Sequence, residues 1–186
     1  AQAAGGGVRI QSGTVTVTSG SIYNNVAKHN DGLGLVRGGG VDIIDGTVAF
    51  NDCQFHSNDA YFGGGVWING GTVSFARCNF FGNRADGSGG AVRIKSATVT
   101  FTSCNIYGNV ECANAAGVHV DSGTVRFESS SIIGNEAKYC CANNGAGYDG
   151  WFGISGGFYI IDGTVTFSSC TISGNTDWQL GNGQSG

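Results

Sequence analysis

The sequence contains no proline and no methionine, and it carries little charge. Charged residues make up 12% of the 186 residues, against about 25% in a typical soluble domain. The net charge is −4 and there is no basic run, so nothing in the sequence indicates nucleic-acid binding. No apolar stretch approaches the ~20 residues of a membrane-spanning helix, so we expect no membrane span. Because methionine is absent, we expect Ala1 to follow a processing event or to lie within a longer chain.

Glycine and repetition are abundant instead, with 35 glycines in the chain. The phrase GTVTFSSCTISGN at 163–175 recurs as GTVAFNDCQFHSN, GTVSFARCNFFGN and ATVTFTSCNIYGN. In each of six units a glycine or alanine, at 7, 40, 65, 91, 117 or 157, lies 18 residues before an asparagine. All variation in length falls between that asparagine and the next unit. This pattern is typical of a solenoid, whose coils match their neighbours and whose insertions leave along one edge.

Within each unit the apolar residues alternate, as in Val165-x-Phe167 and Cys170-x-Ile172. Such a period of two predicts β-strands, and no stretch keeps the 3.6-residue period of a helix. We therefore predict an all-β fold: a parallel β-helix of about six coils, with three short strands in each coil. Stacked strands would lie about 4.8 Å apart. We expect residues 1–186 to form a single domain, as a piece of a longer solenoid.

Two short motifs carry a family resemblance. Gly89-Gly90-Ala91-Val92 and Phe80-Phe81-Gly82-Asn83 resemble the GGA[ILV] and FxxN motifs of polymorphic outer-membrane protein repeats. More broadly, residues ~5–175 resemble pectate-lyase-like right-handed parallel β-helices. The resemblance implies a right-handed solenoid. It does not imply one function, because this fold is used by lyases, adhesins, phage spikes and ice binders.

One asparagine closes each unit, at a corner where asparagine is a favoured turn residue. The side-chain amides of stacked asparagines can hydrogen-bond along the solenoid and satisfy the backbone of the turn. We predict an internal asparagine ladder of Asn25, Asn58, Asn83, Asn109, Asn135 and Asn175.

The seven cysteines fall into two groups. Cys53, Cys78, Cys104 and Cys170 share one inward register position, and we interpret them as small apolar filler in the core. The second group lies in the variable segments, where we expect Cys112 to form a disulfide with one of two candidates. Such a bond would indicate an oxidising compartment, and hence an extracellular or cell-surface protein. The candidates are Cys140 and Cys141.

Threonine recurs on the outward side of the GTVTF phrase, which suggests a flat hydroxyl-bearing face. Such arrays can organise surface water, so ice binding is one hypothesis. Arg126 and Glu128 interrupt the face, and threonine is also an ordinary strand residue. The candidate ice-binding residues are Thr14, Thr16, Thr47, Thr72, Thr98, Thr100, Thr124, Thr164 and Thr166.

A polysaccharide lyase-like or carbohydrate-binding protein is another hypothesis. The first strand of each unit carries outward polar residues, of which we expect Lys95 and Asp121 to form an ion pair. Three carboxylates do not stack at one position, so we predict no enzyme, no metal site and no cofactor. An aromatic column could bind sugar, although we favour its packing beneath the variable segments. The outward residues are Asp42, Trp67, Arg93 and His119; the aromatic column contains Tyr23, His56, Phe81 and Tyr107.

The variable segments 26–39 and 136–156 both lie between an asparagine and the next unit, so we expect them on the same edge of the solenoid. Both ends of a solenoid expose unpaired strand edges unless a segment caps them. We therefore predict a non-catalytic extracellular structural or adhesive module whose end coils stack on those of another copy or on further coils of the same parent chain. Candidate partner-binding residues in the variable segments are Lys28, His29, Lys138, Tyr139 and Trp151.

Overall fold

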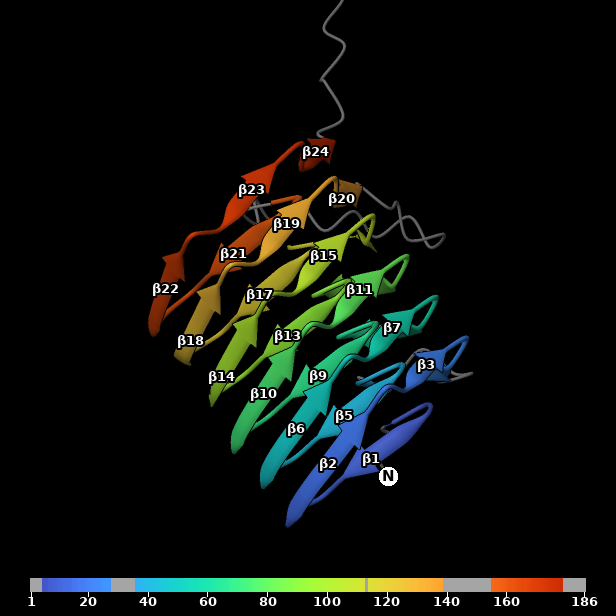
Figure 1. The fold of residues 1–186 in the computed structure, drawn as a ribbon. Helices are drawn as coiled ribbons and strands as arrows, with labels where there is room; N and C mark the ends of the chain where they lie inside the picture. Colours follow the sequence, from blue (N-terminus) through green and yellow to red (C-terminus); the bar gives the residue numbers. More distant parts are fainter. Residues whose placement is uncertain (1–4, 28–35, 113, 139–154, 179–186) are drawn as a thin grey trace, which may run out of the picture.

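The computed structural model describes residues 5–27, 36–112, 114–138 and 155–178. Within these ranges the chain forms β-strands joined by tight turns, wound into six coils that stack along one axis (Figure 1). No helix is present in them, and so none that could cross a membrane. The prediction of an all-β parallel β-helix of about six coils is confirmed.

Each coil contributes one strand to each of four parallel sheets of six strands. The first sheet contains β1 (Val8–Ile10), β5 (Val41–Ile43), β9 (Val66–Ile68), β13 (Val92–Ile94), β17 (Val118–Val120) and β21 (Phe158–Ile160). The second contains β2 (Thr14–Thr18), β6 (Thr47–Asn51), β10 (Thr72–Ala76), β14 (Ala97–Thr102), β18 (Gly123–Glu128) and β22 (Thr164–Ser168). The third contains β3 (Ser21–Tyr23), β7 (Gln54–His56), β11 (Asn79–Phe81), β15 (Asn105–Tyr107), β19 (Ser131–Ile133) and β23 (Thr171–Ser173).

The fourth sheet corrects the prediction of three strands in each coil. It contains β4 (Val26–Ala27), β8 (Asp59–Phe62), β12 (Arg84–Ser88), β16 (Val110–Glu111), β20 (Glu136–Lys138) and β24 (Thr176–Trp178). These strands follow the ladder asparagine and lie in the segment whose length varies between units. Several are only two or three residues long, which is too short for an alternating pattern to be recognised.

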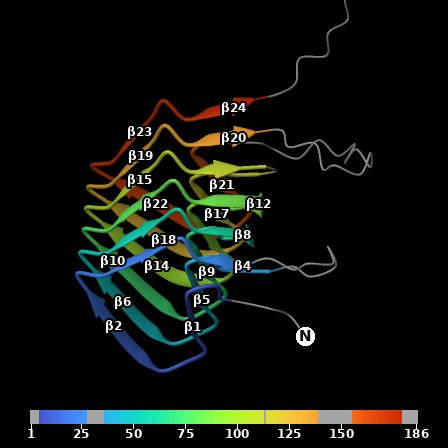
Figure 2. The same ribbon diagram turned by 90° about the vertical axis from the view of Figure 1, so that its right-hand side faces the viewer.

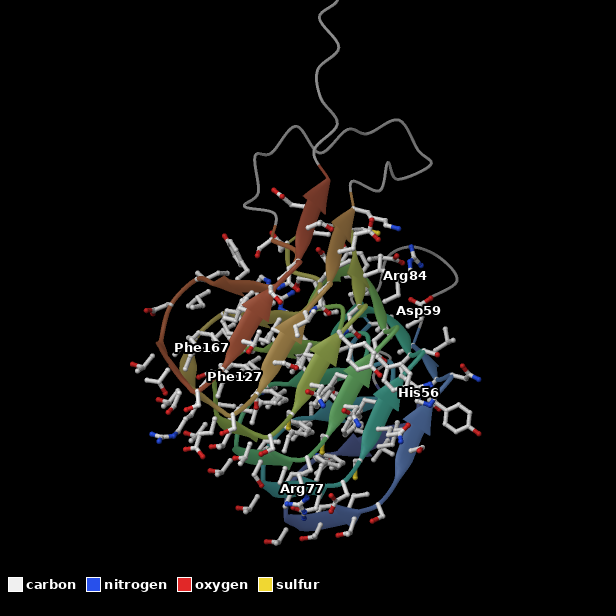
Figure 3. The ribbon with its side chains drawn as sticks, turned by 45° about the horizontal axis from the view of Figure 1, so that its top comes forward. His56, Asp59, Arg77, Arg84, Phe127 and Phe167 are labelled. Carbon is white, nitrogen blue, oxygen red and sulfur yellow. The ribbon has the colours of Figure 1, made fainter. Side chains whose placement is uncertain are left out.

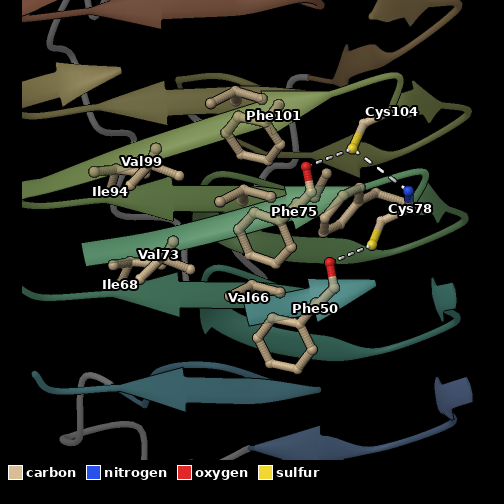
Figure 4. Close-up of a cluster of buried hydrophobic side chains, with 14 of the residues drawn as sticks. Phe50, Val66, Ile68, Val73, Phe75, Cys78, Ile94, Val99, Phe101 and Cys104 are labelled. Carbon is tan, nitrogen blue, oxygen red and sulfur yellow. Dashed lines mark hydrogen bonds between the residues drawn. The ribbon is translucent and has the colours of Figure 1, made fainter. Parts of the chain in front are cut away.

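The core consists of columns of inward side chains that repeat from coil to coil. Parallel pairing places Phe75 next to Phe50 on one side and Phe101 on the other. Their rings are stacked, with centroids 5.3 and 5.0 Å apart and planes within 7° and 12° (Figure 4). Apolar side chains buried in this way contribute about 1.5–3 kcal/mol each. The columns therefore fix the register that holds the coils together.

Glycine forms the corner before the first sheet because stacked backbones approach closely there. A Cβ atom on Gly64 would lie 2.1 Å from the carbonyl oxygen of Arg84. No side chain fits at that distance, which explains the glycine at this position; coil five carries the small residue Ala116 there instead.

The two long insertions leave and re-enter the solenoid between the same two sheets. Residues before them belong to β4 and β20 of the fourth sheet, and the chain returns at β5 and β21 of the first. Figure 2 shows the fourth-sheet strands following one another along a single edge. Residues 28–35 and 139–154 lie outside the described residues, so the placement of the insertions themselves stays a prediction.

Candidate functional site

The six asparagines form a continuous hydrogen-bonded column along the corner between the third and fourth sheets. The Asn83 side chain shows the pattern: its Nδ2 donates to Asn109 Oδ1 at 2.9 Å and to the Phe55 carbonyl at 2.8 Å. Its own Oδ1 accepts from the backbone N–H and the Nδ2 of Asn58, at 3.2 and 3.0 Å. The four central asparagines are fully buried. The column therefore holds the turns together and offers no ligand-binding surface along its buried part.

The column of cysteines lies inside the core. Cys53, Cys78 and Cys104 are fully buried and, with Cys170, are free thiols. The Cys104 thiol donates to the Phe75 carbonyl at 3.3 Å, and the Cys78 thiol donates to the Phe50 carbonyl at 3.4 Å (Figure 4). Burial raises the pKa of Cys53, and the neighbouring Cys104 thiol and burial raise that of Cys78. Cys53 and Cys78 are therefore protonated at neutral pH, whereas the hydrogen bond with Cys78 lowers the pKa of Cys104.

Cys112 differs from the core cysteines because it is not free. Its expected pairing with Cys140 or Cys141 stays a prediction, since both lie outside the described residues. Of the candidate partner-binding residues, Lys28, His29, Tyr139 and Trp151 also lie outside them. Lys138 ends β20, is exposed, and contacts Glu136 at 2.8 Å.

The outward face of the second sheet carries the threonines. Strand pairing aligns one threonine from every coil in an unbroken exposed column, namely Thr14, Thr47, Thr72, Thr98, Thr124 and Thr164. The next outward column is mixed: Thr16, Ala49, Ser74, Thr100, Arg126 and Thr166. Arg126 contacts Glu128, so the two charges on this face neutralise each other.

Three members of the outward column of the first sheet are buried, unlike the threonines of the second. Asp42 is fully buried, and Trp67 and His119 are 4% and 2% exposed. Arg93 lies over the rings of Phe62 and Trp67, at 4.2 and 5.1 Å from their centroids. A polysaccharide could reach these side chains only after the covering residues moved.

Asp121 pairs with Arg93 and His119, which corrects the expected ion pair with Lys95. Arg93 Nη2 contacts both carboxylate oxygens at 3.0 and 3.1 Å, and His119 Nε2 lies 2.7 Å from Oδ1. Burial alone would raise the pKa of Asp121, but the hydrogen bond from His119 and the charge of Arg93 outweigh burial and lower it. Lys95 is exposed. The sequence pattern missed this network because Arg93 and His119 are direct neighbours across β13 and β17, while Asp121 lies just beyond the strand.

Burial raises the pKa of Asp42, although the charges of Arg37 and Arg9 oppose the shift. Its two carboxylate oxygens have no hydrogen-bond partner among the described residues, and Arg9 Nη1 lies 3.7 Å from Oδ2. In the described part of the chain no group of three histidines, cysteines or carboxylates could hold a metal ion.

The aromatic column on the third sheet is partly exposed, and its expected packing beneath the variable segments stays a prediction, because residues 28–35 and 139–154 lie outside the described residues. Tyr23 and Tyr107 are 52% and 43% exposed. The rings of Tyr23, His56, Phe81 and Tyr107 stack in turn, with centroids 4.9, 4.7 and 5.2 Å apart. Because each ring covers the next, mainly ring edges face the solvent. A sugar ring, which packs on an aromatic face, finds few faces here.

The two terminal coils expose apolar residues that are covered elsewhere. In coil six, Phe167 and Ile172 are 40% and 49% exposed, whereas Phe127 and Ile132 one coil below are buried. Figure 3 shows Phe167 in the last coil above Phe127, and the two rings stack at 5.1 Å. In coil one, Val8 is 40% exposed, whereas Val41 above it is buried. Both ends of the described solenoid therefore present uncovered core.

Four stacked parallel sheets around inward apolar columns define a solenoid of the parallel β-helix class. The family described as "Right handed beta helix region" matches residues 2–185, and the chain belongs to this family. None of the curated proteins and none of the solved structures matches the chain. Membership sets the fold and its handedness, but this fold serves enzymes and non-enzymes alike.

Proposed function

We propose that the chain is a non-catalytic structural module of an extracellular assembly, which associates end to end with further copies of itself. The observation that carries the proposal is the exposure of core side chains at both terminal coils, including Val8 at 40% and Ile172 at 49%. Exposed parallel strand edges that bear apolar side chains are templates for pairing with another chain. A second copy supplies an edge of the same width and the same coil shape.

The resemblance to polymorphic outer-membrane protein repeats and an expected disulfide at Cys112 support a cell-surface or extracellular setting. The low charge of the chain, 12% of residues, supports close packing between copies. A surface module of this kind would act in adhesion or as part of a filament.

Multi-angle light scattering of the purified chain over a range of concentrations tests the proposal. The mean mass is expected to rise with concentration, and electron microscopy is expected to show linear particles one solenoid wide. A chain that stays monomeric at several milligrams per millilitre, with terminal coils folded, contradicts self-association.

Ice binding is the second candidate, favoured by the unbroken threonine column of the second sheet. One exposed threonine from every coil lies in register along this flat face. The purified chain should then shape ice crystals and show thermal hysteresis, which Thr98→Lys should abolish. Asn105→Lys is the matched control, because Asn105 is exposed on the third sheet. Equal hysteresis in both variants, or none in the native chain, excludes this function.

A further inference from the structure

The asparagine ladder has a direction. At every junction between coils, the asparagine of one coil donates to the Oδ1 atom of the asparagine in the following coil. The backbone N–H donates at 2.9–3.2 Å. The side-chain Nδ2 donates at 2.9–3.0 Å. In every hydrogen bond between two asparagines, the donor therefore points toward the C-terminal coil.

The two ends of the ladder therefore present opposite groups. In coil one, Asn25 donates to Asn58, while its own Oδ1 has no donor among the described residues. In coil six, the Asn175 Oδ1 accepts from Asn135, and its Nδ2 donates to the Ile132 carbonyl. The Asn175 backbone N–H and the second hydrogen of Nδ2 have no acceptor in the described part of the chain. Among the described residues, the coil-one end therefore lacks a donor for Asn25 Oδ1, and the coil-six end lacks an acceptor for the N–H groups of Asn175.

The strand edges repeat this complementarity. Between coils five and six, Ser129 N–H donates to the Ser168 carbonyl at 2.9 Å, and Thr171 N–H donates to the Ser130 carbonyl at 3.0 Å. The equivalent groups of coil six are Ser169 N–H and the Cys170 carbonyl, which face beyond the last coil. Parallel pairing would give them partners in coil one of a second copy. Those partners are the Thr18 carbonyl and Ser21 N–H, which face the open side of coil one.

The core columns also continue across such a junction. Within the chain, Val17 stacks under Phe50, and Phe127 stacks under Phe167. Phe167 of one copy would lie against Val17 of the next, and Ile172 against Ile22. The corners are compatible as well: a Cβ atom on Gly117 would lie 2.2 Å from the Gly157 carbonyl oxygen of the following coil, and coil six carries Gly157 at the same position, where it would face coil one of a second copy without a side chain.

We propose that copies join only head to tail, coil six of one chain on coil one of the next, with Asn175 donating to Asn25 Oδ1 of the neighbouring copy. This inference rests on the proposed function, since it specifies the orientation of the self-association. Head-to-head contact would set Asn25 Oδ1 against Asn25 Oδ1 and make the strands antiparallel. A head-to-tail contact leaves one free end of each kind, so it propagates into a polar filament.

Two blocked variants of the full chain test the orientation. Val8→Lys places a charge at the coil-one end, and Ile172→Lys places one at the coil-six end; both positions are exposed in the single chain. Light scattering is expected to show that each variant alone has lost assembly and is monomeric. An equimolar mixture is expected to form a heterodimer and nothing larger, because each variant supplies one open end. Homodimers of either variant would overturn the head-to-tail orientation.

Surface crosslinking gives a second readout that does not alter the core. Thr16 and Thr166 are exposed, outward residues of the same column in coils one and six. Residues adjacent in such a column have Cα atoms about 4.8 Å apart, within the range that a disulfide spans. A mixture of Thr16→Cys and Thr166→Cys chains is expected to crosslink under oxidation, and neither variant alone. If the native chain assembles but this mixture gives no crosslink, the inference is wrong while the proposed function stands; a monomeric native chain overturns both.

Discussion

Asp42 places an acid in a fully buried position on the first sheet, where neither carboxylate oxygen has a hydrogen-bond partner within the described part of the chain. Its folded-state pKa is raised by burial above the ordinary value of 3.8. The folded protein therefore holds this proton more tightly than the unfolded chain does. The resulting stability is fully present below pH 3.8 and is lost as pH rises through the raised pKa.

Replacing Asp42 by Asn removes this ionisation, so Asp42→Asn is expected to raise Tm at pH 7 and to have a smaller effect near pH 4. Asp52→Asn is the control of opposite sign. A hydrogen bond from Arg77 lowers the pKa of Asp52, so its contribution is present above pH 3.8 and disappears as pH falls. Thermal melts of both variants across this range measure the difference. A lower Tm for Asp42→Asn at pH 7 would mean that Arg9 and Arg37 stabilise the carboxylate more than burial destabilises it.

Asn83 is the ladder residue with buried neighbours on both sides. Asn83→Ala leaves two donors of Asn58 and the Phe55 carbonyl without partners. Each unpaired buried polar group costs about 1–3 kcal/mol, so we expect a loss of at least ~3 kcal/mol in the free energy of unfolding. Asn79→Ala removes an exposed amide pair with Asn105 and is expected to cost less than ~0.5 kcal/mol. Urea denaturation distinguishes them, and equal losses would show that the ladder adds nothing to stability.

The Phe column is the element that fixes the register of the second sheet. Phe75 is sandwiched between Phe50 and Phe101 and is 1% exposed. Phe75→Ala is expected to cost about 3–5 kcal/mol, because a solenoid core collapses poorly around a cavity whose neighbours are held by stacking. Phe81→Ala, in the partly exposed outer column, is expected to cost less, about 1–3 kcal/mol for the two stacked ring pairs that it removes. Equal losses in urea denaturation would mean that the outer column stabilises the fold as much as the core.

At the scale of strands, the sequence predicted the sheets with strong alternation and missed the sheet without it. The Val-x-Phe and Cys-x-Ile patterns repeat in fixed register, so the second and third sheets could be derived from residue spacing alone. The two residues of β4, Val26–Ala27, and of β16, Val110–Glu111, carry no period. Only pairing with the coils on either side makes them strands.

The contacts of the candidate sites were less predictable than the columns. Residue spacing placed Arg93, His119 and Asp121 on one side of the first sheet, but it could not show that this side is covered. Burial of Arg93 depends on Phe62 and Ser88, which end β8 and β12 in the two coils before it. Likewise, the aromatic column was found from its register, and its exposure follows from the path of the chain in space.

For the whole molecule, we predict that the core cysteines stay as buried thiols while Cys112 forms a disulfide. Burial raises the pKa of Cys53 and contributes to the raised pKa of Cys78, so neither is expected to react with iodoacetamide in the folded chain. All four core thiols should be alkylated after unfolding. Mass mapping without reductant should place Cys112 in a disulfide with Cys140 or Cys141. A disulfide between Cys53 and Cys78 would show that the inward column is not inert.

A solenoid is held together by contacts between neighbouring coils, so a terminal coil has half the contacts of an internal one. Coils one and six should therefore open most readily and exchange their backbone amide hydrogens first. At dilution we expect rapid exchange in β2 and β22 and slow exchange in β10 and β14. Raising the protein concentration should slow exchange at both ends and leave β10 and β14 unchanged, because association stabilises only the coils it covers. Ile172→Lys should abolish this concentration dependence. Coil one binds only coil six of another copy, and every copy of this variant is blocked at coil six. Protection that rises evenly along the chain would instead indicate association through a side face of the solenoid.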